Sequence, residues 1–170
     1  MVVPDGDLQD NPPLAESALQ GGVTPPAFLV PVEVREAPRC GKGHFGVFAV
    51  APISKGTVIW EWTELVTKVH HSKLPAMLEP MAFEAAARYL RQAFVMPDDL
   101  EHLNVNPEDA GRFTNHSSRP NFGIDGALRD ILPGEELVMD YGFHGNPTWY
   151  QDLCAKYGVL TESQVAELYP

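Results

Sequence analysis

Side chains that can bind or orient a ligand are concentrated in two blocks of the C-terminal half of the sequence. The first block, residues 112–121, reads RFTNHSSRPN and contains Asn115 and His116. Its polar turn residues are too dense for a core strand. The second block, residues 129–142, reads RDILPGEELVMDYG, which predicts a strand, a Pro-Gly turn and a short strand leading to Tyr141. An amide, an imidazole and a phenolic hydroxyl are therefore available as hydrogen-bonding groups.

A third block lies upstream of these two. Residues 41–49 read GKGHFGVFA and residues 53–59 read ISKGTVI, a Gly-x-Gly turn followed by two apolar strands. Glycine in such a turn lets the backbone approach a ligand closely. Most Gly-x-Gly turns are only tight connections, but the three blocks in this order resemble the motifs of the SET domain. That domain is the fold of S-adenosylmethionine-dependent protein lysine methyltransferases.

The resemblance covers roughly residues 30–150 and implies a set of site residues. Tyr141 is implied to be the catalytic tyrosine beside the transferring methyl group; the alternative is a strand-end tyrosine packed on the core. The residues implied to bind S-adenosylmethionine are Lys42, Gly43, His44, Asn115, His116 and Trp149. The implied walls of the substrate-lysine channel are Trp62, Ile124, Met139 and Phe143.

Two of these assignments have a purely structural alternative. Asn115 and His116 could form a turn that hydrogen-bonds only itself, although a buried amide and imidazole must find partners. Trp149 could anchor the last helix to the core instead of stacking on the adenine of the cofactor.

Methyl transfer to lysine requires a neutral amine, a bound sulfonium group and an in-line approach of the two. A free lysine, with a pKa near ~10.4, is neutral in only about one molecule in a thousand at pH 7. An apolar channel lowers that pKa because it disfavours the ammonium ion. Aromatic walls attract the charged form as it enters, and alignment then accelerates the reaction. The implied activity therefore predicts an apolar channel with aromatic walls beside Tyr141.

The sequence departs from many SET enzymes at several points. Ser118 stands where many chromatin enzymes have cysteine, and the zinc-binding cysteines after the domain are missing, so the segment from Trp149 would have to close the site. Met139 stands two residues before the tyrosine, where relatives often have Tyr or Phe. Loss of that hydroxyl favours di- or trimethylation. Only seven residues separate Asn121 from Arg129, which predicts a missing or shortened strand in the usual hairpin.

Hydrophobic periodicity predicts the elements that position these residues. Alternating or apolar segments predict strands over residues 28–34, 47–50 and 57–62. Apolar residues at three- and four-residue spacing predict one amphipathic helix over 79–94, and a C-terminal helix is expected after Thr161 as its N-cap. The expected fold class is mainly β (α+β), with small sheets, a helical insert and a C-terminal helix. The resemblance adds a C-terminal pseudoknot.

The expected domain limits follow from composition. Residues 1–27 are rich in Pro and Gly and are expected to form a flexible tail. Residues 28–146 are expected to form the SET domain, with an insert at about 68–108. Residues 147–170 are expected to form a helical segment that closes the site.

Charge and cysteine content narrow the classes of partner. With 12 basic and 23 acidic residues the net charge is −11, so direct nucleic-acid binding is not expected. An acidic surface favours a basic peptide, although acidity can also serve solubility alone. The sequence has no apolar run of roughly 20 residues and no secretory signal. With Cys40 and Cys154 as its only cysteines, a reduced intracellular protein of the nucleus or cytoplasm is expected, with no membrane association.

The histidines give no sign of a metal site in the sequence. His70, His71, His102 and His144 show no metal-ligand spacing with one another or with cysteine, so no metal is assigned.

The sequence as a whole predicts S-adenosylmethionine-dependent methylation of lysine side chains in a protein substrate, by default a histone tail. The alternative is a non-catalytic SET module that binds a basic peptide or the cofactor without turnover. The sequence contains no signal for an oligomeric state.

Overall fold

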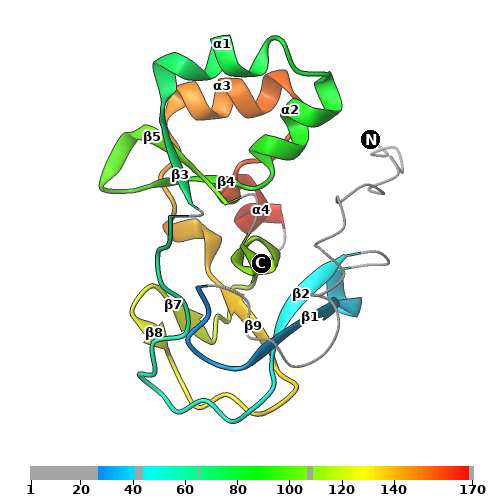
Figure 1. The fold of residues 1–170 in the computed structure, drawn as a ribbon, viewed down its shortest axis with the longest axis vertical. Helices are drawn as coiled ribbons and strands as arrows, with labels where there is room; N and C mark the ends of the chain where they lie inside the picture. Colours follow the sequence, from blue (N-terminus) through cyan, green and yellow to red (C-terminus); the bar gives the residue numbers. More distant parts are fainter. Residues whose placement is uncertain (1–26, 41–43, 65, 107–108, 169–170) are drawn as a thin grey trace.

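The computed structural model describes residues 27–40, 44–64, 66–106 and 109–168. Two hydrophobic cores divide the molecule into two lobes (Figure 1). The β lobe contains strands β1, β2 and β6–β9, and the insert lobe contains strands β3–β5 with helices α1–α3. Apart from Ala27, the predicted N-terminal tail lies outside the described residues.

The β lobe is built on a four-stranded sheet. In sheet order its strands are β1 (Val32–Glu36), β2 (Phe45–Ala49), β9 (Glu136–Met139) and β6 (Asn115–His116). The first three are antiparallel, whereas β6 runs parallel to β9. Val32 and Val34 are buried while Glu33 is exposed, which is the period-two pattern of a strand with one covered face. The core behind the sheet includes Ile53, Ile59, Phe122, Ile131 and Leu137.

Two predicted strands of this lobe differ in extent from the prediction. Residues 28–34 were expected to pair throughout, but β1 begins only at Val32 and Phe28 forms an isolated bridge with Trp60. Pro31 lies between the bridge and β1 and has no N–H donor, so the ladder is interrupted there. The segment 57–62 is correspondingly reduced to this bridge and single backbone hydrogen bonds.

The predicted shortening of the hairpin between Asn121 and Arg129 is confirmed. Strands β7 (Phe122–Gly123) and β8 (Gly126–Ala127) form a two-stranded sheet with only two residues each.

The insert lobe combines a small sheet with three helices. Its antiparallel strands are, in sheet order, β3 (Thr67–His70), β5 (Asp99–Val105) and β4 (Ala93–Met96). The helices are α1 (Leu74–Leu78), α2 (Phe83–Leu90) and α3 (Thr148–Lys156). Buried side chains from all three helices and from β5 share one core; they include Leu74, Leu90, Leu103, Tyr150 and Cys154. Helix α3, although it follows the β-lobe strands in the sequence, is therefore part of the insert lobe.

The predicted helix over residues 79–94 is wrong in its limits. Helix α2 covers only Phe83–Leu90, and the residue before it, Ala82, has an extended backbone. Its buried face contains Ala86, Ala87 and Leu90, whereas Phe83, which has the same apolar spacing, is exposed. Phe94, however, lies in β4, where it pairs with Asn104 of β5. Pairing with a distant strand thus overrides the local helical pattern, and the insert contains a sheet as well as helices.

The C-terminal segment forms two helices. Gly158, at φ 65°, ends α3, and the N–H of Val159 donates to the Cys154 carbonyl at 2.9 Å. Helix α4 (Glu162–Leu168) then begins with Thr161 as its cap, as predicted. The Gln164 N–H donates to Thr161 Oγ1 at 3.4 Å, and the Thr161 N–H donates to Gln164 Oε1 at 2.9 Å. This reciprocal pair is a capping box.

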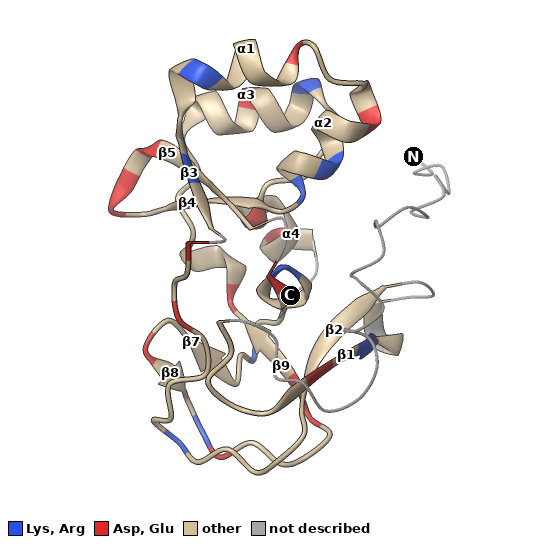
Figure 2. Cartoon of the chain, viewed as in Figure 1, with Lys and Arg blue, Asp and Glu red and all other residues tan. Residues whose placement is uncertain are grey.

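Several 3₁₀ turns connect these elements: η2 (Pro38–Cys40), η3 (His71–Lys73), η4 (Ala110–Phe113) and η5 (Tyr141–Phe143). Acidic residues are spread over both lobes (Figure 2). Within the described part of the chain, no helix has the length and apolar character needed to cross a membrane. Cys40 and Cys154 are not joined by a disulfide.

Candidate functional site

An apolar cleft lies where the two lobes meet. It has about 830 Å³ of empty space, part of it open to solvent, and residues of β4, β7, β9, η4 and η5 line it. Its walls include Tyr141 and all four residues predicted to form the lysine channel, namely Trp62, Ile124, Met139 and Phe143. The structure therefore brings together five side chains that come from three separate segments of the sequence, at residues 62, 124 and 139–143. Their roles stay predictions.

Tyr141 is held in the cleft from both of its ends. Its hydroxyl donates a hydrogen bond to the Thr114 carbonyl at 2.5 Å. Its backbone N–H donates to His116 Nδ1 at 3.0 Å, so a neutral His116 ring carries its proton on Nε2. The ring of His116 also packs beside that of Tyr141, with centroids 5.4 Å apart. Two predicted site residues, one from each C-terminal block, thus fix each other.

The two C-terminal blocks lie side by side because β6 pairs with β9. Asn115 is opposite Val138, and His116 is opposite Met139. Asn121 adds a second tie: its Nδ2 donates to the Glu136 carbonyl at 2.7 Å and its Oδ1 accepts from the Val138 N–H at 2.9 Å. This adjacency is what the predicted pseudoknot requires.

Asn115 also connects these blocks to the upstream one. Its Nδ2 donates to the Phe45 carbonyl at 2.9 Å and to Glu136 Oε1 at 2.7 Å. His44, directly before Phe45, is half-buried, and its carbonyl accepts from the Ala37 N–H at 2.8 Å. Lys42 and Gly43 lie outside the described residues. The partners of Asn115 exclude the alternative of a turn that hydrogen-bonds only itself, since they lie on other strands.

Trp149 is not among the residues that line the cleft. Its ring stacks on His71, with centroids 5.4 Å apart and an interplanar angle of 21°. Its Nε1 donates to the Leu100 carbonyl at 2.8 Å. These contacts fix the start of α3 to β5 of the insert lobe. They favour the structural alternative, an anchor for the helix, over contact with the cofactor.

Four ionisable residues of the cleft lining were not assigned to the site from the sequence: Arg91, Arg112, His144 and Glu162. The pKa values of the last two are shifted. Burial lowers the pKa of His144 to about 4, which keeps its ring neutral at neutral pH. Burial also raises the pKa of Glu162 from its ordinary value of 4.5 to about 7, and Glu162 Oε2 lies 3.0 Å from the Tyr150 hydroxyl. His144 follows Tyr141 by three residues, which is a usable sequence signal. Glu162 reaches the cleft only through the packing of α4 against η5.

A buried carboxylate supports one aromatic wall of the cleft. Asp109 accepts from the Trp60 indole N–H at 3.0 Å and from the Gly111 N–H at 2.6 Å. Burial raises the pKa of Asp109, while these two hydrogen bonds act in the opposite direction. Trp60 in turn packs edge-on against Trp62, with centroids 5.4 Å apart.

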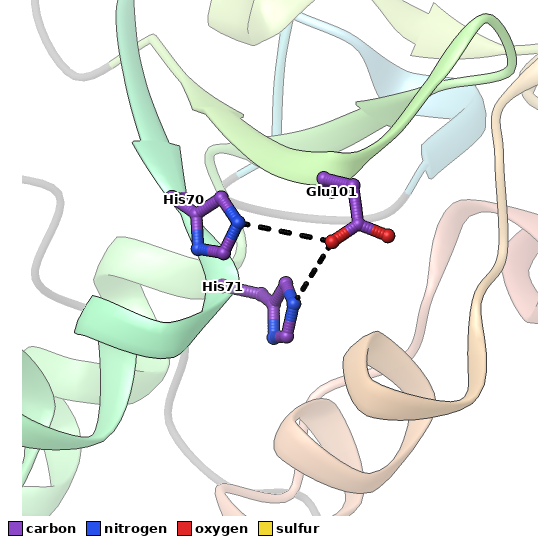
Figure 3. A group of neighbouring side chains, drawn as sticks. All are labelled: His70, His71 and Glu101. Carbon is purple, nitrogen blue, oxygen red and sulfur yellow. Dashed lines mark hydrogen bonds and ion pairs between the residues drawn. The ribbon is translucent and has the colours of Figure 1, made fainter.

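A second group of polar side chains lies outside the cleft, on the insert lobe. His70, His71 and Glu101 each direct one potential metal-ligand atom toward the others (Figure 3). Their spacing along the sequence gave no metal signal, because the pairing of β3 with β5 is what brings them together.

Comparisons with known proteins agree with this arrangement. The family profile described as SET domain matches residues 44–142. One similar solved structure is the Chaetomium thermophilum Polycomb Repressive Complex 2 bound to GSK126, with 21% identity and a TM-score of 0.52. The alignment covers 76% of this chain and 18% of that chain. A search among curated proteins found no match.

A second similar structure is that of the Neurospora SET domain protein DIM-5, a histone lysine methyltransferase. It has 20% identity and a TM-score of 0.50, and the alignment covers 71% of this chain and 54% of that one. The chain therefore spans less than two thirds of the length of either relative. At these identities the likeness is one of fold.

Proposed function

This chain belongs to the SET domain family, and from that premise we propose that it transfers a methyl group from S-adenosylmethionine to the amine of a lysine in a protein substrate. The observation that carries the proposal is the position of Tyr141 in an apolar cleft whose walls include Trp62, Phe143 and Met139. Such a cleft suits the long apolar stem of a lysine and the chemistry that its amine needs.

The cleft favours the neutral form of a bound lysine. A lysine that leaves water for apolar surroundings loses ammonium solvation, so its pKa falls and the amine lone pair becomes available. The aromatic rings of Trp62 and Phe94, with centroids 5.7 Å apart, offer faces that attract the charged form on entry. His144 adds no positive charge because burial holds its pKa at about 4.

Tyr141 would align the amine. Its hydroxyl proton is used in the hydrogen bond to the Thr114 carbonyl, and a phenolic oxygen can accept while it donates, here from an N–H of the substrate amine. Alignment of this kind can supply much of a methyltransferase's acceleration. The hydrogen bond from the Tyr141 backbone N–H to His116 Nδ1 helps to fix the position of Tyr141.

The cofactor would be held where the three sequence blocks meet. When bound, S-adenosylmethionine supplies an activated methyl group on a positively charged sulfur. The described residues beside that place are His44, Asn115 and His116. Both Nδ2 hydrogens of Asn115 are used in its bonds to Phe45 and Glu136, so its side chain would offer Oδ1 as an acceptor, and backbone groups of these segments would meet the rest of the cofactor. Lys42 and Gly43 are proposed to complete this side.

The substrate is proposed to be a basic protein segment, by default a histone tail, in the nucleus or cytoplasm. The net charge of −11 would steer such a segment toward the protein. Met139 lines the cleft without a hydroxyl group, so we propose di- or trimethyl-lysine as the product. Mass spectrometry that finds only monomethyl-lysine on a good substrate would contradict this assignment of Met139.

The test is transfer of labelled methyl from S-adenosylmethionine to core histones and to a whole-cell lysate. Tyr141→Phe is expected to lower the rate by about 100-fold or more, because it removes the hydroxyl that orients the amine. Tyr157→Phe, in the core of the insert lobe, is the matched control and should keep the wild-type rate. If the cofactor binds but no pool is labelled, either the chain is a non-catalytic SET module or its substrate lies outside both pools. If the cofactor does not bind, the proposed site is wrong.

A further inference from the structure

We propose that His70, His71 and Glu101 form a zinc site on the insert lobe, separate from the cleft (Figure 3). One ligand atom from each residue lies within 4.8 Å of the other two. None of the three residues is among those that line the cleft. The site would therefore add a metal-binding function to the proposed methyl transfer, and it does not depend on that proposal.

The distances between the ligand atoms suit zinc. His71 Nε2 is 3.2 Å and His70 Nε2 is 3.7 Å from the same oxygen, Glu101 Oε2. Tetrahedral zinc with bonds of roughly 2.0–2.2 Å keeps its ligand atoms about 3.4 Å apart. Small rotations of the three side chains would therefore centre an ion between them. Figure 3 shows both imidazole rings directed at the carboxylate.

The three proposed ligands lie on regular secondary structure. His70 is the last residue of β3 and pairs with His102 of β5, the neighbour of Glu101. His71 begins the 3₁₀ turn η3 directly after the strand. The three ligands thus come from two hydrogen-bonded strands and a turn at the end of one of them, a rigid support for a metal site.

Neighbouring groups hold both imidazoles in orientations that suit metal binding. His70 Nδ1 accepts from the Ser72 N–H at 3.2 Å and lies 2.9 Å from Ser72 Oγ. Zinc at Nε2 would move the ring proton to Nδ1, which would then donate to this hydroxyl in place of accepting from the N–H. The His70 ring also contacts the edge of His102, whose Nδ1 is 2.8 Å from Asp99 Oδ1. The His71 ring is held by its stack on Trp149.

The donor set selects the class of metal. Two imidazole nitrogens and a carboxylate oxygen match the ligands of zinc, whereas Ca²⁺ and Mg²⁺ prefer oxygen alone. The side chains of His70, His71 and Glu101 are 39%, 34% and 67% exposed, so an ion can reach them from solvent. Water would complete the coordination, as in zinc sites with three protein ligands.

Zinc binding would join three parts of the insert lobe. The ion would tie the end of β3 to β5, and through the His71–Trp149 stack it would also fix the start of α3. It would therefore stabilise the insert lobe against unfolding, since a metal that binds only the folded state shifts the equilibrium toward it.

The experiment is calorimetric titration of the untagged full chain with zinc chloride. One equivalent should bind to the wild type, and the affinity should fall by more than about 100-fold in His71→Ala, since even partners outside the first coordination shell change metal affinity by 10–100-fold. Glu101→Gln, a change at a largely exposed side chain, is the variant that keeps the test valid if His71→Ala does not fold. Glu79→Gln, an exposed carboxylate elsewhere in the insert lobe, should bind zinc like the wild type.

A second variant and a second readout test the ligand set. His102→Ala removes a neighbouring imidazole that is not proposed as a ligand, so it should still bind one equivalent; loss of binding would overturn the ligand set. With cobalt in place of zinc, the fluorescence of Trp149 should be quenched in the wild type but not in Glu101→Gln. Zinc affinity that is equal in the wild type, His71→Ala and Glu101→Gln would overturn the site.

Discussion

Both lobes enclose an apolar core, and in the β lobe asparagine side chains add directed polar contacts that tie strands β2, β6 and β9 together. In the β lobe, Asn121 bridges to the backbone of β9 and Asn115 bridges β2 to β9. In the insert lobe, Leu90, Leu103 and Tyr150 meet in one buried core. A hydrogen bond constrains both distance and direction, while an apolar contact mainly requires volume. Residue identity is therefore specified strictly in the β lobe, and residue size and pattern suffice in much of the insert lobe.

The largest effect that this comparison predicts is at Gly126 of the β lobe. Its φ is 118°, and a Cβ there would lie 2.4 Å from the Thr57 carbonyl oxygen. That oxygen accepts the N–H of Ala127, so it cannot move without breaking the pairing. Gly126→Ala should lower the free energy of unfolding by more than about 3 kcal/mol, measured by urea denaturation. A loss below about 1 kcal/mol would mean that the β lobe adapts as readily as the insert lobe.

A cavity in the insert core should lower the free energy of unfolding by a comparable amount, but a substitution that nearly conserves volume should cost much less. Leu103 is fully buried, so Leu103→Ala should lower the free energy of unfolding by about 2–5 kcal/mol. Leu103→Met, which nearly conserves volume, should cost less than about 1.5 kcal/mol. The shape of the unfolding curve sharpens the comparison. A single transition means that the lobes unfold together, and two transitions mean that only the insert lobe is weakened.

The effect of pH should come next in size, through Glu162. Its pKa in the folded protein is about 7 against an ordinary value of 4.5. Below pH 4.5 both the folded and unfolded states are protonated. Between these values the unfolded state ionises first, so the contribution of Glu162 to stability falls as the pH rises and then levels off above about 7. His144, with a folded pKa of about 4 against an ordinary 6.5, contributes an opposing rise between these two values, so the Glu162 effect is measured as the difference between the wild type and Glu162→Gln. Glu162→Gln should flatten this decline, raising stability at pH 8 by about 1–3 kcal/mol.

Thermal unfolding of Glu162→Gln and the wild type at pH 4 to 8 measures this effect. Glu167→Gln, an exposed carboxylate of the same helix, is the control and should leave the wild-type pH profile unchanged. A decline of equal slope in the wild type and Glu162→Gln would assign the pH dependence to another group.

The smallest predicted effect is at Gly158, the counterpart of Gly126. Gly158 also has a positive φ, 65°, but no heavy atom lies within 4 Å of the position of a Cβ. Gly158→Ala should therefore cost only the backbone preference, about 1 kcal/mol. If Gly158→Ala lowers the free energy of unfolding as much as Gly126→Ala does, backbone conformation alone would explain both losses. The close contact with Thr57 would then contribute nothing measurable.

The same difference explains what the sequence could predict. The β-lobe motifs around Asn115 and Tyr141 depend on residue identity, and they indicated the family and a set of residues that the structure brings together in one cleft. The N-cap of α4 could be predicted from Thr161 because capping involves residues close in sequence, whereas Gln164, its reciprocal partner, was not predicted. The first two residues of β4, Ala93 and Phe94, were mistaken for helix because Phe94 continues the helical periodicity and only its pairing with β5 makes it part of a strand. The cluster of His70 and His71 with Glu101 was missed for the same reason.

Helix α3 has a consequence for how the protein is made. Tyr150 and Cys154 cover Leu103 and its neighbours, yet they are synthesised more than forty residues after them. The core of the β lobe is likewise incomplete until Leu137 of β9 has been synthesised. A chain that leaves the ribosome N-terminus first therefore cannot complete either core early, and the apolar face of the insert sheet remains open to chaperones, or to aggregation, until α3 emerges.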